Sequence, residues 1–423
     1  MTSSPPRIPI PKNGVDYRGK VVLAPMVRSG ELPSRLLALK YGADLVWGPE
    51  TIDRALIGTT RRENPMTNTI DFTRPSSNGL KNSAHNPDQR ESVIYRLHPT
   101  QEHKKLIFQI GTANPETAVQ AAKLVAADVA GIDVNSGCPK PFSTSGGMGA
   151  ALLRTPDTLC RILEALVKEV GEPHEIGISV KIRLLETPEK TEALVRRLVK
   201  TGITGLTVHC RTTPMRPRER AIREQLKMIA GVCREAGVAC VMNGDVENRE
   251  QAVQLMQEYG CDGAMIATAA ERNSSVFRAK EDGGRAGWKE LVREYMQFAL
   301  EVENRWGNTK FLLSQMIPGK EASYMRMNQS KGYEQLIEAL GFEDLRDLAK
   351  DVDDRLGLNN RVDKPTKRAN AREENKRKQM EEAGEDSQTK KIRVPPAALN
   401  KPLESIVVPD AAAEVAPGTA LSI

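Results

Sequence analysis

The chain has 423 residues, enough for a barrel of roughly 250 residues plus a further domain. Lysine and arginine number 61 against 55 acidic residues, so the formal charge of +6 is a mild excess whose distribution matters more than its sum. The sequence shows no run of about 20 apolar residues and no signal-like N-terminus, which argues against a membrane protein or a secreted one. We expect no membrane association and a location in the cytoplasm or the nucleus, with the mitochondrion left open.

The six cysteines form neither a disulfide pattern nor a metal-binding pattern. No C-x-x-C pair occurs, and most of the cysteines lie in apolar stretches that are typical of strands or helices. We therefore expect reduced thiols and no metal site. The cysteines are Cys138, Cys160, Cys210, Cys233, Cys240 and Cys261.

After an N-terminal segment that we expect to be flexible (1–17), short apolar runs recur along the chain. Each run is nearly continuous in apolar residues, which is typical of strands buried on both faces of a parallel sheet. Eight such runs occur, at 20–24, 44–47, 106–110, 131–134, 178–182, 205–209, 238–242 and 263–267.

Stretches with helical periodicity lie between most of these runs. Two of them begin with a capping residue followed by proline, Asn114-Pro115 and Thr155-Pro156, which is typical of a helix start. Eight strands alternating with helices predict an α/β fold, a (β/α)8 TIM barrel over 18–283, with an open doubly wound sheet as the alternative. The predicted helices are 31–41, 115–128, 155–170, 188–201, 219–236 and 247–259.

Three intervals depart from this alternation. Residues 58–103 contain no convincing helix, so we expect an insertion that runs over the surface or is partly disordered. Helical patterns alone fill 284–360, which predicts a C-terminal helical domain. Residues 361–423 are charged and bear prolines, as a disordered basic tail would. Its basic runs suit a nuclear address or an arm that attracts RNA, and a solvated tail is the simpler alternative.

Residues at the carboxyl ends of the predicted strands are the candidates for chemistry, because barrel enzymes place their reactive groups there. Each has a structural explanation when taken alone: Lys181 could be a rim lysine, His209 a structural histidine, and Asn243-Gly244 a turn. Their shared position favours a site for a planar, polar-edged, phosphorylated ligand, with phosphate bound by the loops after the last two strands. The candidates are Pro25, Met26, Gln109, Asn135, Lys181, Arg183, His209, Arg211, Asn243, Gly244, Asp245, Ala267 and Thr268.

Cys138 differs from the other cysteines in its surroundings. Gly137 precedes it, Pro139 follows it, and a glycine-rich segment (145–149) comes next, so a turn at the strand end would aim the thiol into the mouth of the barrel. The alternative, a buried inert thiol, fits this position poorly. An unperturbed thiol pKa of about 8.5 leaves the group mostly protonated at neutral pH, so it can act as a general acid.

Taken in order, these segments resemble the dihydrouridine synthase family. The resemblance spans roughly 20 to 280 and rests on L-A-P-M-V, A-D-L-V-W-G-P-E, F-Q-I-G, G-I-D-V-N-S-G-C-P-K, S-T-S-G-G-M-G-A-A-L-L, V-K-I-R, V-H-C-R and M-N-G-D. Within the family, G-G-M-G-A-A-L-L and N-T-K-F-L-L-S-Q-M make the chain most similar to the eukaryotic type that acts on uridine 20 of tRNA.

The resemblance implies an enzyme that reduces the C5=C6 bond of a uridine in tRNA, with FMN as cofactor and NADPH or NADH as reductant. Cys138 would protonate C5 while C6 receives the hydride. The resemblance also implies the binding roles. FMN would pack against Pro25, Met26 and Val27, with Gln109, Lys181 and His209 around its ring, and its phosphate would bind at Asn243, Gly244, Asp245, Ala267 and Thr268. The uracil or its phosphate would contact Asn135, Arg183 and Arg211.

One departure and two alternatives accompany this assignment. Thr268 stands where the family usually has an arginine, which removes a cation facing the phosphate or the RNA. A different FMN barrel acting on a small molecule, dihydroorotate dehydrogenase-like or an ene-reductase, is one alternative, but it explains neither the helical domain nor the basic arm. The other is a catalytically idle RNA-binding relative. We expect a monomer.

Overall fold

The computed structural model describes residues 7–75, 91–216 and 218–359. These residues belong to one compact unit, which ends at Asn360. The tail predicted over 361–423, the start of the N-terminal segment and residues 76–90 of the predicted insertion lie outside the described residues.

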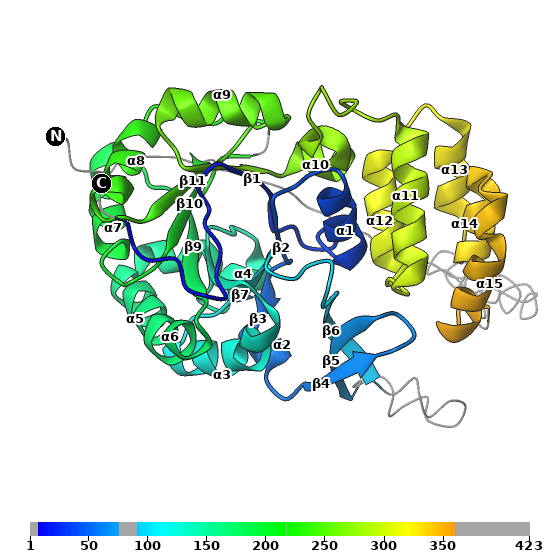
Figure 1. Cartoon of the computed structure of the whole chain (residues 1–423), viewed down its shortest axis with the longest axis horizontal. Coiled ribbons are helices and arrows are strands. Elements are labelled where there is room, and N and C mark those ends of the chain that lie inside the picture. The colour runs from blue at the N-terminus through cyan, green and yellow to red at the C-terminus, as the bar shows by residue number, and fades with distance from the viewer. Residues whose placement is uncertain (1–6, 76–90, 217, 360–423) are drawn as a thin grey trace, which may run out of the picture. The chain divides into compact units, whose positions relative to one another are not determined.

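The described chain folds around a closed parallel barrel, which confirms the predicted TIM barrel and excludes the open sheet. Eight strands follow one another around the barrel, the pairing of β2 with β7 closes it, and the short β3 (Thr51–Ile52) also pairs with β7. Helices surround the barrel (Figure 1). The eight strands are β1 (Lys20–Leu23), β2 (Leu45–Trp47), β7 (Leu106–Gly111), β8 (Gly131–Ser136), β9 (Gly177–Leu184), β10 (Gly205–Thr212), β11 (Ala239–Asn243) and β12 (Gly263–Ile266).

Apolar side chains fill the barrel as well as the layer between its strands and helices. Inside, the rings of Tyr17 and Trp47 lie with their centroids 5.8 Å apart. Tyr17 also packs against the first residue of β10, Gly205, where a methyl group would lie only 2.6 Å from the ring. The expectation of a flexible segment over 1–17 is therefore wrong for Tyr17, because this buried ring fills the amino end of the barrel.

The predicted helices are present, although two of them begin differently. Asn114 caps α3 by accepting a hydrogen bond from the backbone N–H of Thr117, as predicted, whereas Thr155 makes no such bond at α5. The helix predicted from 219 begins only at Leu226, because Glu219 and Ala221 before it bond to Arg211 of β10 and to Asp245 in the loop after β11 instead. The helices are α1 (Leu32–Lys40), α3 (Pro115–Val125), α5 (Pro156–Leu166), α7 (Pro188–Leu198), α8 (Leu226–Glu235) and α9 (Arg249–Tyr259), with the short α2 (Asp53–Leu56), α4 (Pro141–Thr144), α6 (Glu172–His174) and α10 (Thr268–Arg272).

The insertion after β2 contains a three-stranded antiparallel sheet that the sequence did not reveal. Its strands are β4 (Thr60–Asn64), β5 (Thr69–Pro75) and β6 (Glu91–Leu97). Most of β4 is exposed, so it lacks the apolar alternation by which a half-buried strand is predicted. Tyr95 of this sheet packs edge-on against Phe108 of β7, with ring centroids 4.8 Å apart, and so anchors the sheet on the barrel.

The C-terminal part of the described chain is helical and has its own core. The core is not separate from the barrel, because Leu37 and Tyr41 at the end of α1 belong to it. The helices are α11 (Trp288–Glu301), α12 (Trp306–Met316), α13 (Ala322–Gln329), α14 (Tyr333–Leu340) and α15 (Arg346–Arg355). We call α11–α15 the helical segment.

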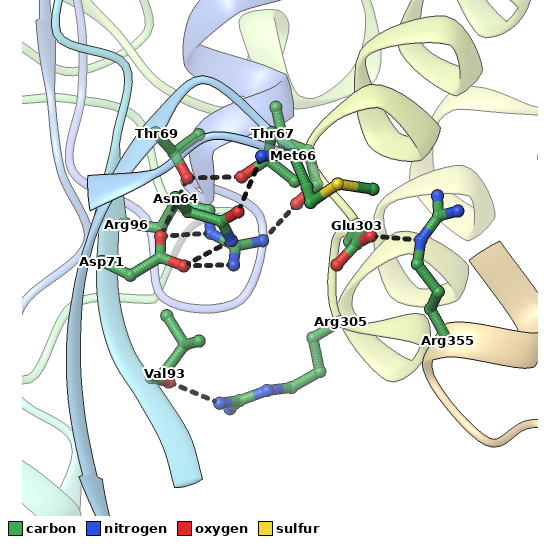
Figure 2. Close-up of polar contacts among 11 residues, drawn as sticks. Asn64, Met66, Thr67, Thr69, Asp71, Val93, Arg96, Glu303, Arg305 and Arg355 are labelled. Carbon is green, nitrogen blue, oxygen red and sulfur yellow. Dashed lines mark hydrogen bonds and ion pairs between the residues drawn. The ribbon is translucent and has the colours of Figure 1, made fainter. Parts of the chain in front are cut away.

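Polar contacts join the insertion sheet to the helical segment (Figure 2). Arg96 on β6 donates hydrogen bonds of 2.6 and 2.5 Å to the Asp71 carboxylate and another to the carbonyl oxygen of Val302, between α11 and α12. Arg305 donates to the carbonyl oxygen of Val93 at 3.0 Å. The insertion therefore braces the helical segment against the barrel.

A buried ion pair connects the barrel, the insertion and the loop after β1. Arg35 on α1 donates to both carboxylate oxygens of Glu102, at 2.6 and 3.1 Å, and each side chain is 1% exposed. Arg35 also donates to the carbonyl oxygens of Gly30 and Arg96, and Glu102 accepts from the backbone N–H of His98. Burial lowers the pKa of Arg35, but the charge of Glu102 raises it above its ordinary value, so the guanidinium stays charged.

Removing the anion of this pair should destabilise the protein. Glu102→Gln leaves the Arg35 charge buried without compensation, so we expect the free energy of unfolding to fall by about 3–5 kcal/mol in urea titrations. Glu186→Gln is the control, because its pair with Lys190 is exposed, and no measurable change is expected. A Glu102→Gln protein as stable as the control would show that the buried pair does not hold these parts together.

Candidate active site

The strand register brings the predicted polar residues to one rim of the barrel. Asn135 at the end of β8 pairs with Lys181 on β9, and His209 on β10 pairs with Asn243 on β11. Because these strands are parallel, their carboxyl ends leave the barrel on the same side. These four residues therefore lie at the same rim of the barrel.

The first and last strands contribute neighbouring loops to the same rim. The backbone N–H of Ala24 donates to the carbonyl oxygen of Ile266 at 2.9 Å, so the segments that start at Pro25 and Ala267 leave the barrel side by side. Met26 and Val27 follow Pro25, and Val27 is 47% exposed. Thr268 begins α10. An apolar surface thus lies close to the predicted phosphate loop.

Lys181 is directed toward the next strands and does not simply extend from the rim. Its amine donates to Asn243 Oδ1 at 3.1 Å, and Asn243 Nδ2 in turn donates to the carbonyl oxygen of Met265 at 3.0 Å. Burial, together with the nearby Arg183 cation, lowers the pKa of Lys181 to about 8. The amine is thus a cation at neutral pH that gives up its charge in mildly alkaline solution.

His209 is neutral over the whole physiological range. Its burial and the surrounding cations Lys181, Arg183 and Arg211 lower its pKa to about 2. Arg211 Nη1 lies 3.2 Å from His209 Nε2. Because a guanidinium can only donate, Nε2 accepts this hydrogen bond and the ring proton must sit on Nδ1. The neutral imidazole therefore carries its N–H at Nδ1.

Arg211 and Asp245 form an anchor between the loops after β10 and β11. Arg211 donates to Asp245 Oδ1 at 2.6 Å and to the carbonyl oxygen of Glu219 at 2.8 Å, and Asp245 Oδ2 accepts from the backbone N–H of Ala221 at 2.7 Å. Partial burial raises the pKa of Asp245, but the bond from Arg211 outweighs it, so the pKa is lowered. The Asp245 carboxylate is thus ionised and engaged, and only its backbone suits a phosphate. In this structure Arg211 shapes the loop that was predicted to bind ligand.

The turn that carries Cys138 is held by hydrogen bonds from both sides. Asn135 Oδ1 accepts from the backbone N–H groups of Gly137, at 3.0 Å, and of Cys138, at 3.1 Å. Arg183 donates to the carbonyl oxygens of Gly137 and Thr212. The thiol is half-buried, and burial raises its pKa, with the neighbouring Glu50 carboxyl adding to the effect. Asn135 and Arg183, which the resemblance assigned to the uracil, here fix the backbone that presents the thiol.

Gln109 is turned into the barrel. Its amide Nε2 donates to Asp133 Oδ2 at 2.8 Å, and the Ser179 hydroxyl donates to Asp133 Oδ1 at 2.7 Å. Burial raises the pKa of Asp133 to about 6, and these two hydrogen bonds lower it in part. The side chain of Gln109 is therefore buried inside the barrel and held there by Asp133.

Glu50 is a rim residue that the analysis of the sequence did not single out. It follows Gly48-Pro49 at the end of β2, and its Oε1 accepts a 2.7 Å hydrogen bond from the Ser143 hydroxyl of α4. Burial raises its pKa, and the interactions with Ser143 and Cys138 lower it in part. The available signal was its position, since an acidic residue directly after a buried apolar strand is a strand-end candidate like the others.

A cavity of about 1060 Å³ lies at the opposite end of the barrel. Its lining includes Ala130 and Glu175, which precede β8 and β9, together with His98 and Arg61 of the insertion. Barrel enzymes carry out their chemistry at the carboxyl ends of the strands, so this cavity is not the candidate site.

The described part of the chain contains neither a metal-binding cluster nor a membrane-spanning helix. No group of three or more His, Cys, Asp or Glu side chains there could hold a metal ion. None of the helices described is both long and apolar enough to cross a membrane.

Most of the chain is similar to known proteins. Residues 22–370 match the family model described as "Dihydrouridine synthase (Dus)". A protein of Schizosaccharomyces pombe named tRNA-dihydrouridine(20) synthase (NAD(P)+) is 50% identical over 334 residues, which are 78% of this chain and 66% of that protein. A Saccharomyces cerevisiae protein of the same name is 45% identical over 386 residues, 89% of this chain and 98% of that protein. A probable tRNA-dihydrouridine synthase of Aquifex aeolicus is 27% identical over 286 residues.

The matched region includes all the strands from β2 to β12, the Cys138 turn and the helical segment. It covers well over half of the chain, and the match to the budding yeast protein runs over nearly the whole of that relative. The chain belongs to the dihydrouridine synthase family.

Proposed function

We propose that this protein reduces the C5=C6 bond of a uridine in tRNA, at position 20, to 5,6-dihydrouridine, with FMN as its cofactor and NADPH or NADH as its reductant. Family membership and the names of the two yeast relatives support this function. The observation that carries it is the fixed turn that holds the Cys138 thiol at the same rim as Lys181 and His209. A flavin barrel acting on a small molecule is not favoured, since the matched relatives are named as tRNA enzymes.

Cys138 is the proton donor in the proposed reaction. Hydride addition at C6 builds negative charge at C5 and O4 of the uracil, and an acid held at C5 neutralises that charge as it forms. Burial raises the pKa of the thiol, so its sulfur carries a proton at neutral pH. The turn donates hydrogen bonds to Asn135 and accepts one from Arg183, and these bonds fix its position, as a general acid requires.

The residues at the mouth suit a flavin, which when bound would supply the hydride. Lys181 offers a cation and His209 a neutral N–H donor, both suited to the polar edge of the ring system. Val27 offers an exposed apolar surface for one face of the ring. These three residues would hold and orient the cofactor.

The phosphate of FMN would lie at the loops after β11 and β12. Arg223 donates to the carbonyl oxygens of Gly244 and Asp245, and its Nε is buried without a hydrogen-bond partner among the described residues. A buried donor without a partner is costly, so a phosphate oxygen within its reach would satisfy it. We propose that this arginine supplies the positive charge that Thr268 does not.

The tRNA would contact the loop after β10 and the helical segment. Arg216, Arg218 and Arg220 are exposed in that loop, on the rim that carries Cys138. On another side of the rim, Asn308 of α12 donates to the Glu31 carboxylate at 2.8 Å, which places the helical segment beside the loop after β1. Drawing a base out of its stack costs a few kcal/mol, and phosphate contacts of this kind would offset that cost.

Replacing the proposed acid should separate the two half-reactions. In Cys138→Ala, flavin reduction by NADPH is expected to be unchanged, while dihydrouridine formation in tRNA falls by about 10²–10⁴-fold. Cys160→Ala is the control, because this thiol is also half-buried but lies on α5, away from the rim. Normal dihydrouridine formation by Cys138→Ala, measured by mass spectrometry of the tRNA, would remove the assignment.

The charge of Lys181 should make flavin binding depend on pH. The pKa of Lys181 is about 8 in the free protein. Below pH 8 the amine is already charged and can bind the electron-rich ring edge, whereas above pH 8 it must first take up a proton. FMN affinity should therefore be flat from pH 7 to 8 and fall as the pH rises further, by up to about tenfold per unit. Fluorescence titration of Lys181→Met should give weaker binding that is flat over the whole range. An equally steep fall in this variant would assign the titration to another group.

The exposed arginines should set the salt dependence of tRNA binding. Changing Arg216, Arg218 and Arg220 together to Gln is expected to weaken binding and to lower the slope of log K against log salt by about 2, if each contacts a phosphate. A matched control changes three exposed lysines, Lys105, Lys168 and Lys200, at the other end of the barrel. Filter-binding titrations in which both triple variants shift equally would point to diffuse attraction and not to a contact surface.

A further inference from the structure

Glu50 and Cys138 belong to one cluster at the mouth. The Ser143 hydroxyl, which donates to Glu50 Oε1, lies close to the Cys138 turn: a methyl group on Gly149 would be 2.5 Å from Ser143 Oγ and 3.3 Å from Cys138 Cβ. The end of β7 leaves room for the carboxyl, since a methyl group on Gly111 would lie 2.5 Å from Glu50 Oε1. Two glycines thus allow the acid and the thiol to approach each other.

The two oxygens of the Glu50 carboxyl differ in their surroundings. Oε2 is buried without a hydrogen-bond partner among the described residues, although Oε1 is bonded to Ser143. Burying an ionised carboxylate costs free energy when one of its oxygens has no hydrogen-bond partner. A neutral carboxyl instead carries a proton on that oxygen, which it can donate. Burial raises the pKa of Glu50, and the carboxyl and the thiol each influence the other's pKa. The pair therefore favours sharing one proton over carrying two negative charges.

The proposed reaction leaves a proton deficit at this cluster. Each turnover removes the proton of the Cys138 thiol, and the resulting thiolate must be reprotonated before the next one. Arg183, which borders the turn, cannot serve because a guanidinium does not deprotonate in proteins. Burial of the thiol also restricts direct access of water. Lys181 also carries a proton, but the proposed function keeps its charge at the flavin. Among the described acidic side chains, Glu50 is the one that acts on the thiol and can return a proton to it.

We propose that Glu50 is the relay acid that returns a proton to Cys138 after each turnover. The O–H bond of the neutral carboxyl breaks, an S–H bond forms at Cys138 Sγ, and the carboxylate then takes a proton from water, so that no oxidant or reductant is needed. This inference rests on the function proposed above. It adds a residue that acts through Cys138 and does not itself touch the uracil.

Single and multiple turnovers should separate this role from a structural one. When Glu50→Gln with reduced flavin meets tRNA, the thiol is already protonated, so the single-turnover rate should stay within about twofold of the unmodified enzyme. Steady-state kcat should fall tenfold or more and should rise with the concentration of a small buffer acid, which replaces the missing donor. Ser143→Ala keeps an acid at position 50, so its kcat should remain independent of the buffer.

The outcomes distinguish this proposal from the function on which it rests. An unchanged kcat for Glu50→Gln, or equal losses in single and multiple turnovers, would overturn the relay while leaving dihydrouridine formation by the unmodified enzyme intact. Failure of that enzyme to form dihydrouridine would instead overturn the proposed function.

A measurement without flavin or tRNA tests the pairing itself. In flavin-free protein that carries Cys160→Ala, the pH profile of Cys138 alkylation by iodoacetamide reports the thiol pKa. Glu50→Gln should move that profile to lower pH, because the carboxyl contributes to raising the pKa of the thiol. Superimposable profiles would show that the two groups are not coupled and would overturn the relay.

Discussion

The hydrogen-bonded register of the parallel strands is the constraint on which the site depends. Asn135, Lys181, Thr207 and their neighbours lie opposite one another across β8, β9 and β10 because each strand is paired on both sides and the ring is closed by β2 and β7. A shift of one residue in any of these strands would turn its polar side chain from the mouth to the outer layer of apolar residues. The apolar contacts inside and outside the barrel thus fix the positions of chemical groups that contribute little to stability themselves.

That constraint also sets the electrostatics of the mouth. Three cations converge on one side, Lys181, Arg183 and Arg211, and their combined field, added to burial, keeps His209 neutral. Cys138 and Glu50 are acids whose pKa values are raised, so protons are retained there, and Arg183 borders the turn that carries the thiol. A ligand that gains negative charge in the reaction would thus meet fixed cations and available protons at the same mouth.

The sequence was sufficient to predict the barrel and the strand ends that form its mouth, but not the contacts between side chains there. The eight strands could be recognised because runs buried on both faces are continuously apolar, whereas the insertion sheet escaped notice because β4 is mostly exposed. Strand-end position identified Asn135, Arg183 and Arg211 without showing that they are engaged in holding loops, since their partners are backbone atoms that no residue type marks. The proximity of Glu50 to the thiol was missed for a related reason, because the two residues follow β2 and β8 and meet only after the barrel closes.

The loop after β1 shows why the helical segment and the barrel must be treated together. Arg28, with a positive φ of 71°, places its guanidinium 4.2 Å from the centre of the Phe311 ring, Asn308 bonds to Glu31, and Gly30 is bonded to the buried Arg35. The loop that would support one face of the flavin is therefore held by the helix proposed to contact tRNA. Binding energy gained at a distance from the base can assist the reaction only if the two sites keep a fixed separation. The insertion provides that rigidity, because Arg96 and Arg305 join its sheet to the helical segment independently of the loop itself.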